Sequence, residues 1–279
     1  MSESEVIRSA KSGSDWTRNE LIAYNIKIVP QTPEQFFGAP TFGILAELDT
    51  SIIIGSTDTA NLSDAALRYL TFLDLATHVA GNHWQKTLLD EFSRQTLDLL
   101  GYSERGLALL TQYNIPMTIC GDNKSAQTDV CLVDGRTVMI LLILQGDKTA
   151  LNSSNSSNPE ARVVAEAIAA FQYNNEKRER RGMTVLDKMI LPCITMVGTC
   201  PTFYLVPVNQ ALSDAVTTGQ YPPMPTEVSK CATMTRIAGH NHISSEGMEK
   251  PEYRIVALGH FMAFKTLAKR HWENFLVTE

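Results

Sequence analysis

The stretch that decides the fold is Gln127-Thr128-Asp129-Val130-Cys131-Leu132-Val133, then Asp134-Gly135, then Val138 to Leu144, closing with Gln145-Gly146-Asp147-Lys148. Two apolar runs separated by Asp-Gly predict a β-hairpin, because this dipeptide favours the tight turns that join antiparallel strands. The second run is apolar on both faces, which indicates a central strand covered on both sides. Pro159 and Glu160 then suit the first turn of a helix that runs to about Asn175.

The pattern on either side of this stretch is that of one α/β domain. Helical periodicity over residues 61–100 predicts two amphipathic helices, which we interpret as a helical insertion. Another helix is expected from about Asp15 to Lys27. The other expected elements are strands at Leu107–Cys120, Met189–Val197 and Thr202–Val208 and a closing helix at Tyr253–Phe275. We predict a disordered tail over residues 1–13 and a single domain over residues 14–279.

Composition and charge argue against several classes of protein. Of the 279 residues, 44% are hydrophobic and 19% are charged, as in ordinary folded proteins. The formal charge of −6 provides no global basic field for coating nucleic acid or acidic lipid. The first residues lack the basic and apolar regions of a signal peptide, and no apolar run approaches the ~20 residues that span a bilayer. We therefore expect an intracellular protein without a membrane partner, with its five cysteines reduced.

Acidic residues and a lysine gather around the predicted hairpin. Cleavage of a phosphodiester by a divalent cation needs carboxylates to hold the ion and a nearby cation or base to position water. Residues two apart on a strand share a face, so an acid at position 146 and Lys148 would point at one spot. Asp129 would add a carboxylate from the neighbouring strand, and Mg²⁺ typically takes one or two carboxylates. Gln172 and Glu20, each on a helix, are candidates for orienting water or the outer shell of the metal.

With these residues the chain resembles the PD-(D/E)XK, or restriction-endonuclease-like, superfamily, and more narrowly its uncharacterised basidiomycete fungal members. The resemblance covers about residues 14–270. Its matching segments are Asp15-Trp16-Thr17-Arg18-Asn19-Glu20-Leu21, Gln127-Thr128-Asp129-Val130-Cys131, Gln145-x-Asp147-Lys148, Ala165-Glu166-Ala167-Ile168-Ala169-Ala170-Phe171-Gln172 and Val197-Gly198-Thr199-Cys200-Pro201-Thr202-Phe203.

The resemblance implies a restriction-endonuclease-like α/β core with a mixed central sheet flanked by helices. It also implies Mg²⁺ dependence and nucleic-acid substrates. Carried over to this sequence, it makes Asp129 the first metal ligand and Lys148 the lysine of the terminal motif. Glu20 and Gln172 become the helix-borne helpers.

The chain departs from the superfamily pattern at Gly146, where Asp or Glu is expected. Asp147 is adjacent, but strand alternation turns it to the opposite face unless a bulge intervenes. Glu166, on the following helix, is the other candidate for the missing ligand, so the candidate metal ligands are Asp129, Glu166 and Asp147. A two-residue turn at Asp134-Gly135 would pair Asp129 with Ile140, leaving position 146 roughly 20 Å away along the strand. The site therefore requires a wider turn or a bend near Cys131.

Two hypotheses follow. In the first, the protein is a Mg²⁺-dependent nuclease for DNA or RNA. In the second, it keeps the nuclease fold without catalysis and acts as a binding or regulatory module, which Gly146 favours. Each candidate residue also has an ordinary structural interpretation, such as a capping role for Glu20 or an exposed position for Gln172. A basic patch is available for nucleic acid, although it also fits a solvated helix end; it consists of Lys177, Arg178, Arg180 and Arg181.

Overall fold

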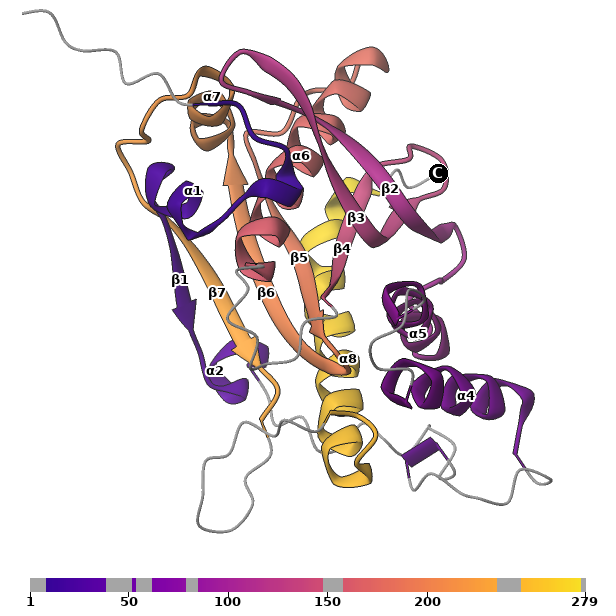
Figure 1. Ribbon diagram of the computed structural model, residues 1–279. Coiled ribbons are helices and arrows are strands. Elements are labelled where there is room, and N and C mark those ends of the chain that lie inside the picture. Colours follow the sequence, from indigo (N-terminus) through magenta and orange to yellow (C-terminus); the bar gives the residue numbers. More distant parts are fainter. Residues whose placement is uncertain are drawn as a thin grey trace, which may run out of the picture.

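The computed structural model describes residues 9–38, 52–53, 62–78, 85–147, 158–234 and 247–276. Its centre is a seven-stranded sheet with the strand order β1-β7-β6-β5-β4-β3-β2 (Figure 1). The strands are β1 (Ile26–Pro30), β2 (Leu107–Ile119), β3 (Asp122–Asp134), β4 (Ile140–Asp147), β5 (Lys188–Val197), β6 (Cys200–Asn209) and β7 (Thr226–Ala232). The predicted hairpin around Asp129 is formed by β3 and β4, and the strand predicted at Leu107–Cys120 is β2, which pairs with β3.

The sheet is mixed. β1 pairs in parallel with β7, and β4 pairs in parallel with β5, whereas the other neighbours are antiparallel. A parallel step from β4 to β5 needs a crossover connection, which α6 (Pro159–Arg180) provides. The predicted α/β class and the mixed central sheet are thus confirmed.

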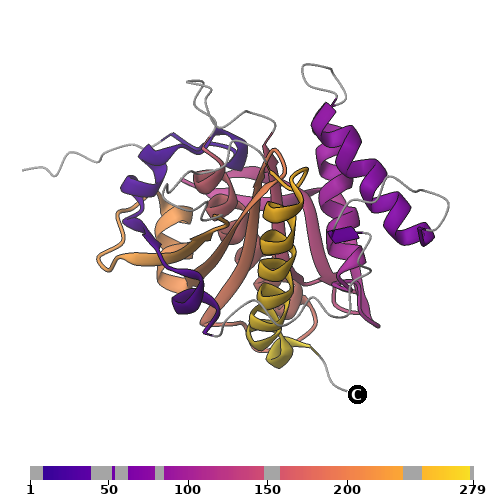
Figure 2. The same ribbon diagram turned by 90° about the horizontal axis from the view of Figure 1, so that it is seen from below.

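Helices cover both faces of the sheet (Figure 2). α6 packs across β2 to β6 on one face, and the sheet's other face is covered by α5 against β2 to β4 and by α8 against β5 and β6. The remaining helices are α1 (Arg18–Ala23), α2 (Pro33–Phe37), α4 (Asp64–His78), α5 (Gln85–Leu99), α7 (Gln210–Thr218) and α8 (Pro251–Trp272), with 3-10 turns at Gly13–Asp15 and Glu273–Phe275.

Each face of the sheet has its own hydrophobic core. Cys131 and Ile143 belong to the core under α6, whereas Leu132 and Leu144 belong to the core under α5 and α8. All eight residues of β4 are buried. This confirms the central, doubly covered strand that the apolar run at Leu141 to Leu144 predicts.

Buried amide bonds fix α6 against β4. The side chain of Asn174 donates to the Ile140 carbonyl and accepts from the Ile140 N–H, both at 2.8 Å. At the start of the helix, the Asn158 side chain caps the Ala161 N–H at 3.2 Å. The helix begins at Pro159 as predicted and continues past Asn175 to Arg180.

The N-terminal region differs from the predicted helix reaching Lys27. α1 ends at Ala23, and Asn25 takes a left-handed φ of 52° before β1 begins at Ile26. Ile26 and Ile28 therefore belong to a strand that adds to β7 at the edge of the sheet. Helical and strand periodicities cannot be separated in so short an apolar run, and the pairing with β7 decides between them.

The two helices predicted over residues 61–100 are confirmed as α4 and α5. α5 covers the sheet itself, because Leu89, Phe92 and Leu97 join the core under α5 and α8. At the other end of the domain, Lys11 pairs with Glu20 and Gly13 is buried, so packed chain begins somewhat before residue 14. α7 and β7 have no counterpart in the sequence-based prediction.

Two further sequence-based expectations concern membranes and cysteines. Among the helices that the structure describes, none is both long and apolar enough to span a bilayer. All five cysteines are free thiols, and Cys131, Cys193 and Cys231 are buried.

Candidate functional site

The connection between β3 and β4 is wider than the expected two-residue turn. The Asp134 N–H donates to the Met139 carbonyl at 3.0 Å, and the Asp134 carboxylate accepts from the Thr137 N–H at 3.0 Å. Val138 takes a left-handed φ of 60° to close the loop. With Val133 paired to Ile140, the connection is four residues longer than a tight Asp134-Gly135 turn, which would pair Val133 with Arg136.

This wider turn changes the register at Asp129. Val130 pairs with Leu144, which brings Asp129 to the level of Gln145 and not of Ile140. Its carboxylate reaches one residue further and accepts a hydrogen bond from the Gly146 N–H. The register predicted from a tight turn is wrong, and the wider turn that the site requires is present. The Gln145-Gly146 segment of β4 and Asp129 of β3 therefore meet.

β3 changes its orientation at Asp129. Ala126 belongs to the core under α6, whereas Val130 and Leu132 belong to the opposite core, so strict alternation fails between them. On β2, Gln112 lies where the pairing with β3 skips a residue and takes a left-handed φ of 49°. An irregularity of this kind turns a side chain away from its regular face. It directs Asp129 toward α5, beyond the last paired residues of β3 and β4.

Asp129 is buried, and both of its carboxylate oxygens are bonded. Oδ2 accepts from the Gly146 N–H at 2.7 Å, and Oδ1 forms an ion pair with Lys86 Nζ. Lys86, at the start of α5, also pairs with Asp90 one turn later, at 3.3 Å. α5 therefore delivers both an acid and a lysine to the place where β3 and β4 separate.

Gly146 marks the point where these groups converge. A Cβ on residue 146 would lie 3.0 Å from Asp90 Oδ1 and 3.4 Å from Asp129 Oδ2. The Asp90 carboxylate thus occupies the space into which an acid at position 146 would project. The strand has no side chain at position 146, and α5 places a carboxylate beside it.

The pKa of Asp90 reflects this crowding. Burial and then the neighbouring Asp129 charge raise the pKa of Asp90 to about 6, although Lys86 opposes the rise. A carboxyl group with such a pKa is ionised at neutral pH and accepts a proton more readily than an ordinary aspartate.

Glu166 lies on α6, close enough to Asp129 for the two charges to interact. Burial, followed by the charge of Asp129, raises the pKa of Glu166 well above its usual value, while Arg162, Lys86 and Thr128 act in the opposite direction. Oε2 of Glu166 and Oε1 of Gln145 are buried without a hydrogen-bond partner among the described residues. Each unsatisfied buried acceptor costs about 1–3 kcal/mol, so these two oxygens are unexplained by the packing alone.

The oxygen atoms around Asp129 belong to carboxylate and amide groups, the ligand types that a hard divalent cation takes. Asp129 and Asp90 alone meet the usual Mg²⁺ requirement of one or two carboxylates, and the unpaired oxygens of Glu166 and Gln145 are of the same type. Within residues 9–38, 52–53, 62–78, 85–147, 158–234 and 247–276, however, no group of three His, Cys, Asp or Glu side chains is gathered tightly enough to hold a metal. The structure brings two carboxylates together here, those of Asp129 and Asp90.

Asp147 and Lys148 have different outcomes. Asp147 is buried and pairs with Val197 in the sheet. It shares a face of β4 with Gln145, two residues earlier, so it faces away from the side on which Gly146 meets α5. It is not part of the group formed by Asp129 and Asp90. Lys148 lies outside the described residues.

Glu20 and Gln172 form local structural bonds. Glu20 completes the capping box of α1 by accepting from the Thr17 N–H at 2.7 Å, and it pairs with Lys11. Partial burial raises the pKa of Glu20, but the bonds from Lys11 and Thr17 outweigh it and lower the pKa overall. Gln172 bonds to both backbone groups of Thr118, at 2.9 and 3.2 Å, and so ties α6 to β2. The structure gives neither residue a bond to Asp129.

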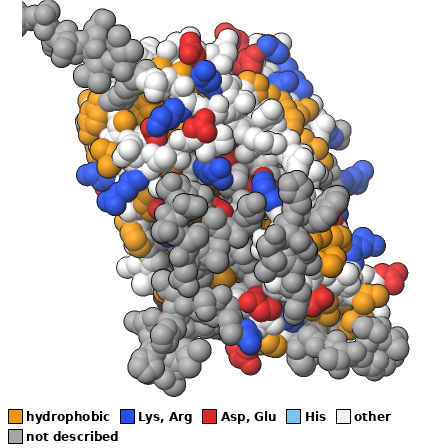
Figure 3. Space-filling model, in the orientation of Figure 1, with side chains coloured by type: hydrophobic (Ala, Val, Ile, Leu, Met, Phe, Trp, Pro, Cys, Tyr) orange, Lys and Arg blue, Asp and Glu red, His pale blue; other side chains and the backbone are white. Residues whose placement is uncertain are grey.

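The predicted basic patch lies at the far end of α6 from Glu166. Arg178 is twelve positions further along the helix, roughly 18 Å at 1.5 Å per residue. Arg178 and Arg181 donate to backbone carbonyls, and Arg180 pairs with Glu176. On the face shown in Figure 3, basic and acidic side chains are interspersed. The patch is therefore distant from the acidic site and partly engaged in structural bonds.

Lys86 and Asp90 are the two site residues that the sequence analysis misses. Their i, i+4 spacing within an amphipathic helix is visible in the sequence, but this spacing is common on solvated helix faces. The additional signal is burial, because Asp90 lies on the same stretch of α5 as Leu89, Phe92 and Ser93, which are all buried. Comparisons with known proteins add no relative, since neither the protein-family models nor the curated proteins contain a match to this chain.

Proposed function

We propose that the protein is a Mg²⁺-dependent phosphodiesterase of the restriction-endonuclease-like type that acts on nucleic acid. The observation that carries the proposal is the convergence of Asp129, Asp90 and Lys86 on the vacant Cβ position of Gly146. The mixed sheet with helices on both faces agrees with the core that the sequence resemblance implies. Asp90 replaces the acid that the superfamily pattern expects at position 146.

Asp129 and Asp90 would hold the metal, and water and phosphate oxygens would complete its coordination shell. A bound Mg²⁺ would polarise the scissile phosphate and lower the pKa of a bound water. The Gly146 N–H orients Asp129 by fixing Oδ2 at 2.7 Å. This bond prepares the carboxylate before any ligand arrives.

Asp90 and Lys86 are suited to holding the charges of the reaction. Burial and the Asp129 charge raise the pKa of Asp90 to about 6, so a cation held by both carboxylates would relieve the repulsion between them. The Lys86 side chain is 45% exposed, so a phosphate could reach its ammonium group from solvent. There the ammonium group would stabilise the developing negative charge, the role that the sequence assigns to Lys148.

Cleavage of plasmid DNA, single-stranded DNA and RNA by the purified full chain tests the proposal. We expect cleavage with Mg²⁺ or Mn²⁺ that EDTA abolishes and that falls by about 100-fold in Asp129→Asn and in Asp90→Asn. Asp98→Asn changes an exposed acid on the same helix and is the matched control. Cleavage that is equal in all three variants places the reaction elsewhere, and absence of cleavage on every substrate refutes the proposal.

One observation favours the second candidate, a nuclease-fold binding protein without catalysis. The Lys86 ammonium group lies against both Asp129 and Asp90 and places a positive charge where a metal ion would lie. If this pairing is permanent, calorimetry will detect no Mg²⁺ binding to the wild type and will detect binding to Lys86→Ala. The phosphodiesterase instead predicts Mg²⁺ binding to the wild type, and Asp129→Asn removes it.

A further inference from the structure

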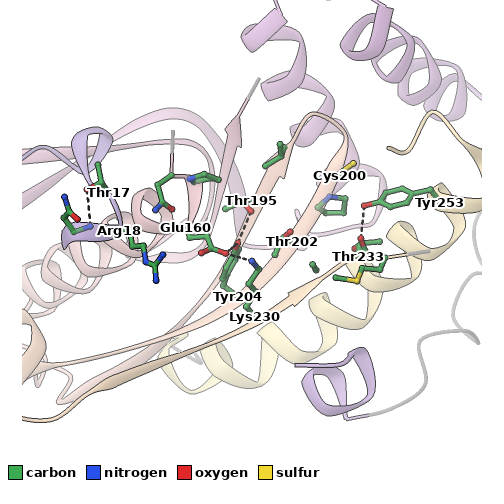
Figure 4. Close-up of a pocket in the computed structure, with 17 residues that line it drawn as sticks. Thr17, Arg18, Glu160, Thr195, Cys200, Thr202, Tyr204, Lys230, Thr233 and Tyr253 are labelled. Carbon is green, nitrogen blue, oxygen red and sulfur yellow. Dashed lines mark hydrogen bonds and ion pairs between the residues drawn. The ribbon is translucent and has the colours of Figure 1, made fainter. Parts of the chain in front are cut away.

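A cavity lies on the α6 side of β5, β6 and β7. It has a volume of about 650 Å³ and is bounded by the first turns of α1 and α6 and by Tyr253 of α8 (Figure 4). Pockets for small molecules usually measure ~300–1,000 Å³. Neither Asp129 nor Asp90 lines this cavity, so it is separate from the acidic site.

The floor of the cavity carries a connected polar network. Thr195 Oγ1 donates to the Tyr204 hydroxyl, which donates to Glu160 Oε1, each at 3.4 Å. Lys230 Nζ forms an ion pair with the same Glu160 oxygen (Figure 4). The four residues come from α6, β5, β6 and β7, so the fold assembles hydrogen-bond donors and acceptors from distant parts of the chain at one place.

The charge of the cavity is unbalanced at its rim. Glu160 and Lys230 neutralise each other on the floor. Arg18, which also lines the cavity, is exposed and has no carboxylate partner among the described residues. One guanidinium group is therefore available for a ligand, and its planar array of donors suits the oxygens of a phosphate or a carboxylate.

The walls between the rim and the floor are largely apolar. They include Val197, Pro201, Ala232 and the ring of Tyr253. Thr202 projects into this part of the cavity, and its hydroxyl has no hydrogen bond to any residue that the structure describes (Figure 4). Apolar walls with a few placed polar groups are typical of sites that enclose a ring-bearing ligand.

We propose that this cavity binds a nucleoside monophosphate. The base and ribose would lie between the apolar walls, where Thr202, Thr195 and the Glu160–Lys230 pair offer donors and acceptors to the ribose hydroxyls and the base edge. The phosphate would meet Arg18 at the rim. This proposal concerns binding alone and does not depend on the phosphodiesterase activity.

Isothermal titration calorimetry on the full chain, with the four nucleoside 5′-monophosphates as ligands, tests the proposal. Adenosine supplies the ring without the anion, and inorganic phosphate supplies the anion without the ring. We expect at least one monophosphate to bind about tenfold or more tightly than both partial ligands, since the charge-assisted bond to Arg18 adds to the enclosure of the ring.

Two variants locate the binding. Arg18→Ala should weaken it about tenfold and Thr202→Val about fivefold. Arg68→Ala changes an exposed arginine on α4 and should leave affinity unchanged. The proposal is overturned if no monophosphate binds, if adenosine or phosphate alone binds equally well, or if Arg18→Ala and Thr202→Val retain wild-type affinity. Circular dichroism confirms that each variant is folded.

Discussion

Replacing Asp90 with asparagine should stabilise the protein at neutral pH. In the folded state, burial and the Asp129 charge raise the pKa of Asp90 from 3.8 to about 6. The unfolded chain therefore releases this proton at a lower pH than the folded protein, and the wild type loses stability as the pH rises from about 4 to about 6. A shift of about two pKa units corresponds to ~3 kcal/mol at 1.36 kcal/mol per unit. The side chain is 6% exposed, so solvent screens little of this effect.

Urea unfolding of the wild type and of Asp90→Asn measures the effect. The measurements are made at closely spaced pH values between about 3.5 and about 8, a range that brackets both pKa values. The difference in unfolding free energy should grow in favour of the variant through this window by ~3 kcal/mol and then level off. Asp98→Asn serves as the control for an Asp-to-Asn change on an exposed part of α5. A difference in unfolding free energy between wild type and Asp90→Asn that does not vary with pH would show that folding does not raise the pKa of Asp90.

Three further changes test other parts of the structure. Gly146→Ala should lower the free energy of unfolding in urea by ~1 kcal/mol, because the new Cβ would lie 3.0 Å from Asp90 Oδ1. The loss should be smaller in an Asp90→Ala background, and equal losses in both backgrounds would exclude this contact. Glu166→Gln should lessen the fall in stability that the wild type shows as the pH rises through the raised pKa of Glu166, and unchanged pH dependence would contradict the burial of this acid. Asn174→Ala should cost ~2–4 kcal/mol, since it leaves both backbone groups of Ile140 unpaired, and thermal unfolding within error of the wild type would refute this anchoring of α6.

The sequence is sufficient for the core elements because their signals are local. The run at Leu141 to Leu144, which is apolar on both faces of the strand, identifies the central strand, and Pro159 marks the start of the crossover helix. The register between β3 and β4 is not local. It depends on the five-residue connection in which Val138 adopts a left-handed φ, and a valine gives no warning of this conformation.

The candidate site was predictable only in part for the same reason. Asp129 and its proximity to Gly146 follow from the strand pattern and a widened turn. Asp90 enters the site only because α5 docks on the sheet, a tertiary event that the Lys86–Asp90 spacing does not indicate. Glu20 and Gln172 are the opposite case: both match the sequence pattern of a site, but in the structure each bonds to backbone groups instead.

The outer strands of the sheet have a consequence for association between copies of the chain. β1 is short and ends at Pro30, and β2 carries Pro116 and the left-handed Gln112. A proline has no N–H to offer to an incoming strand, and a kinked edge cannot align with a straight one. Both edge strands are therefore poor templates for pairing with a strand of another copy. This protects the protein from aggregating through the edges of its sheet.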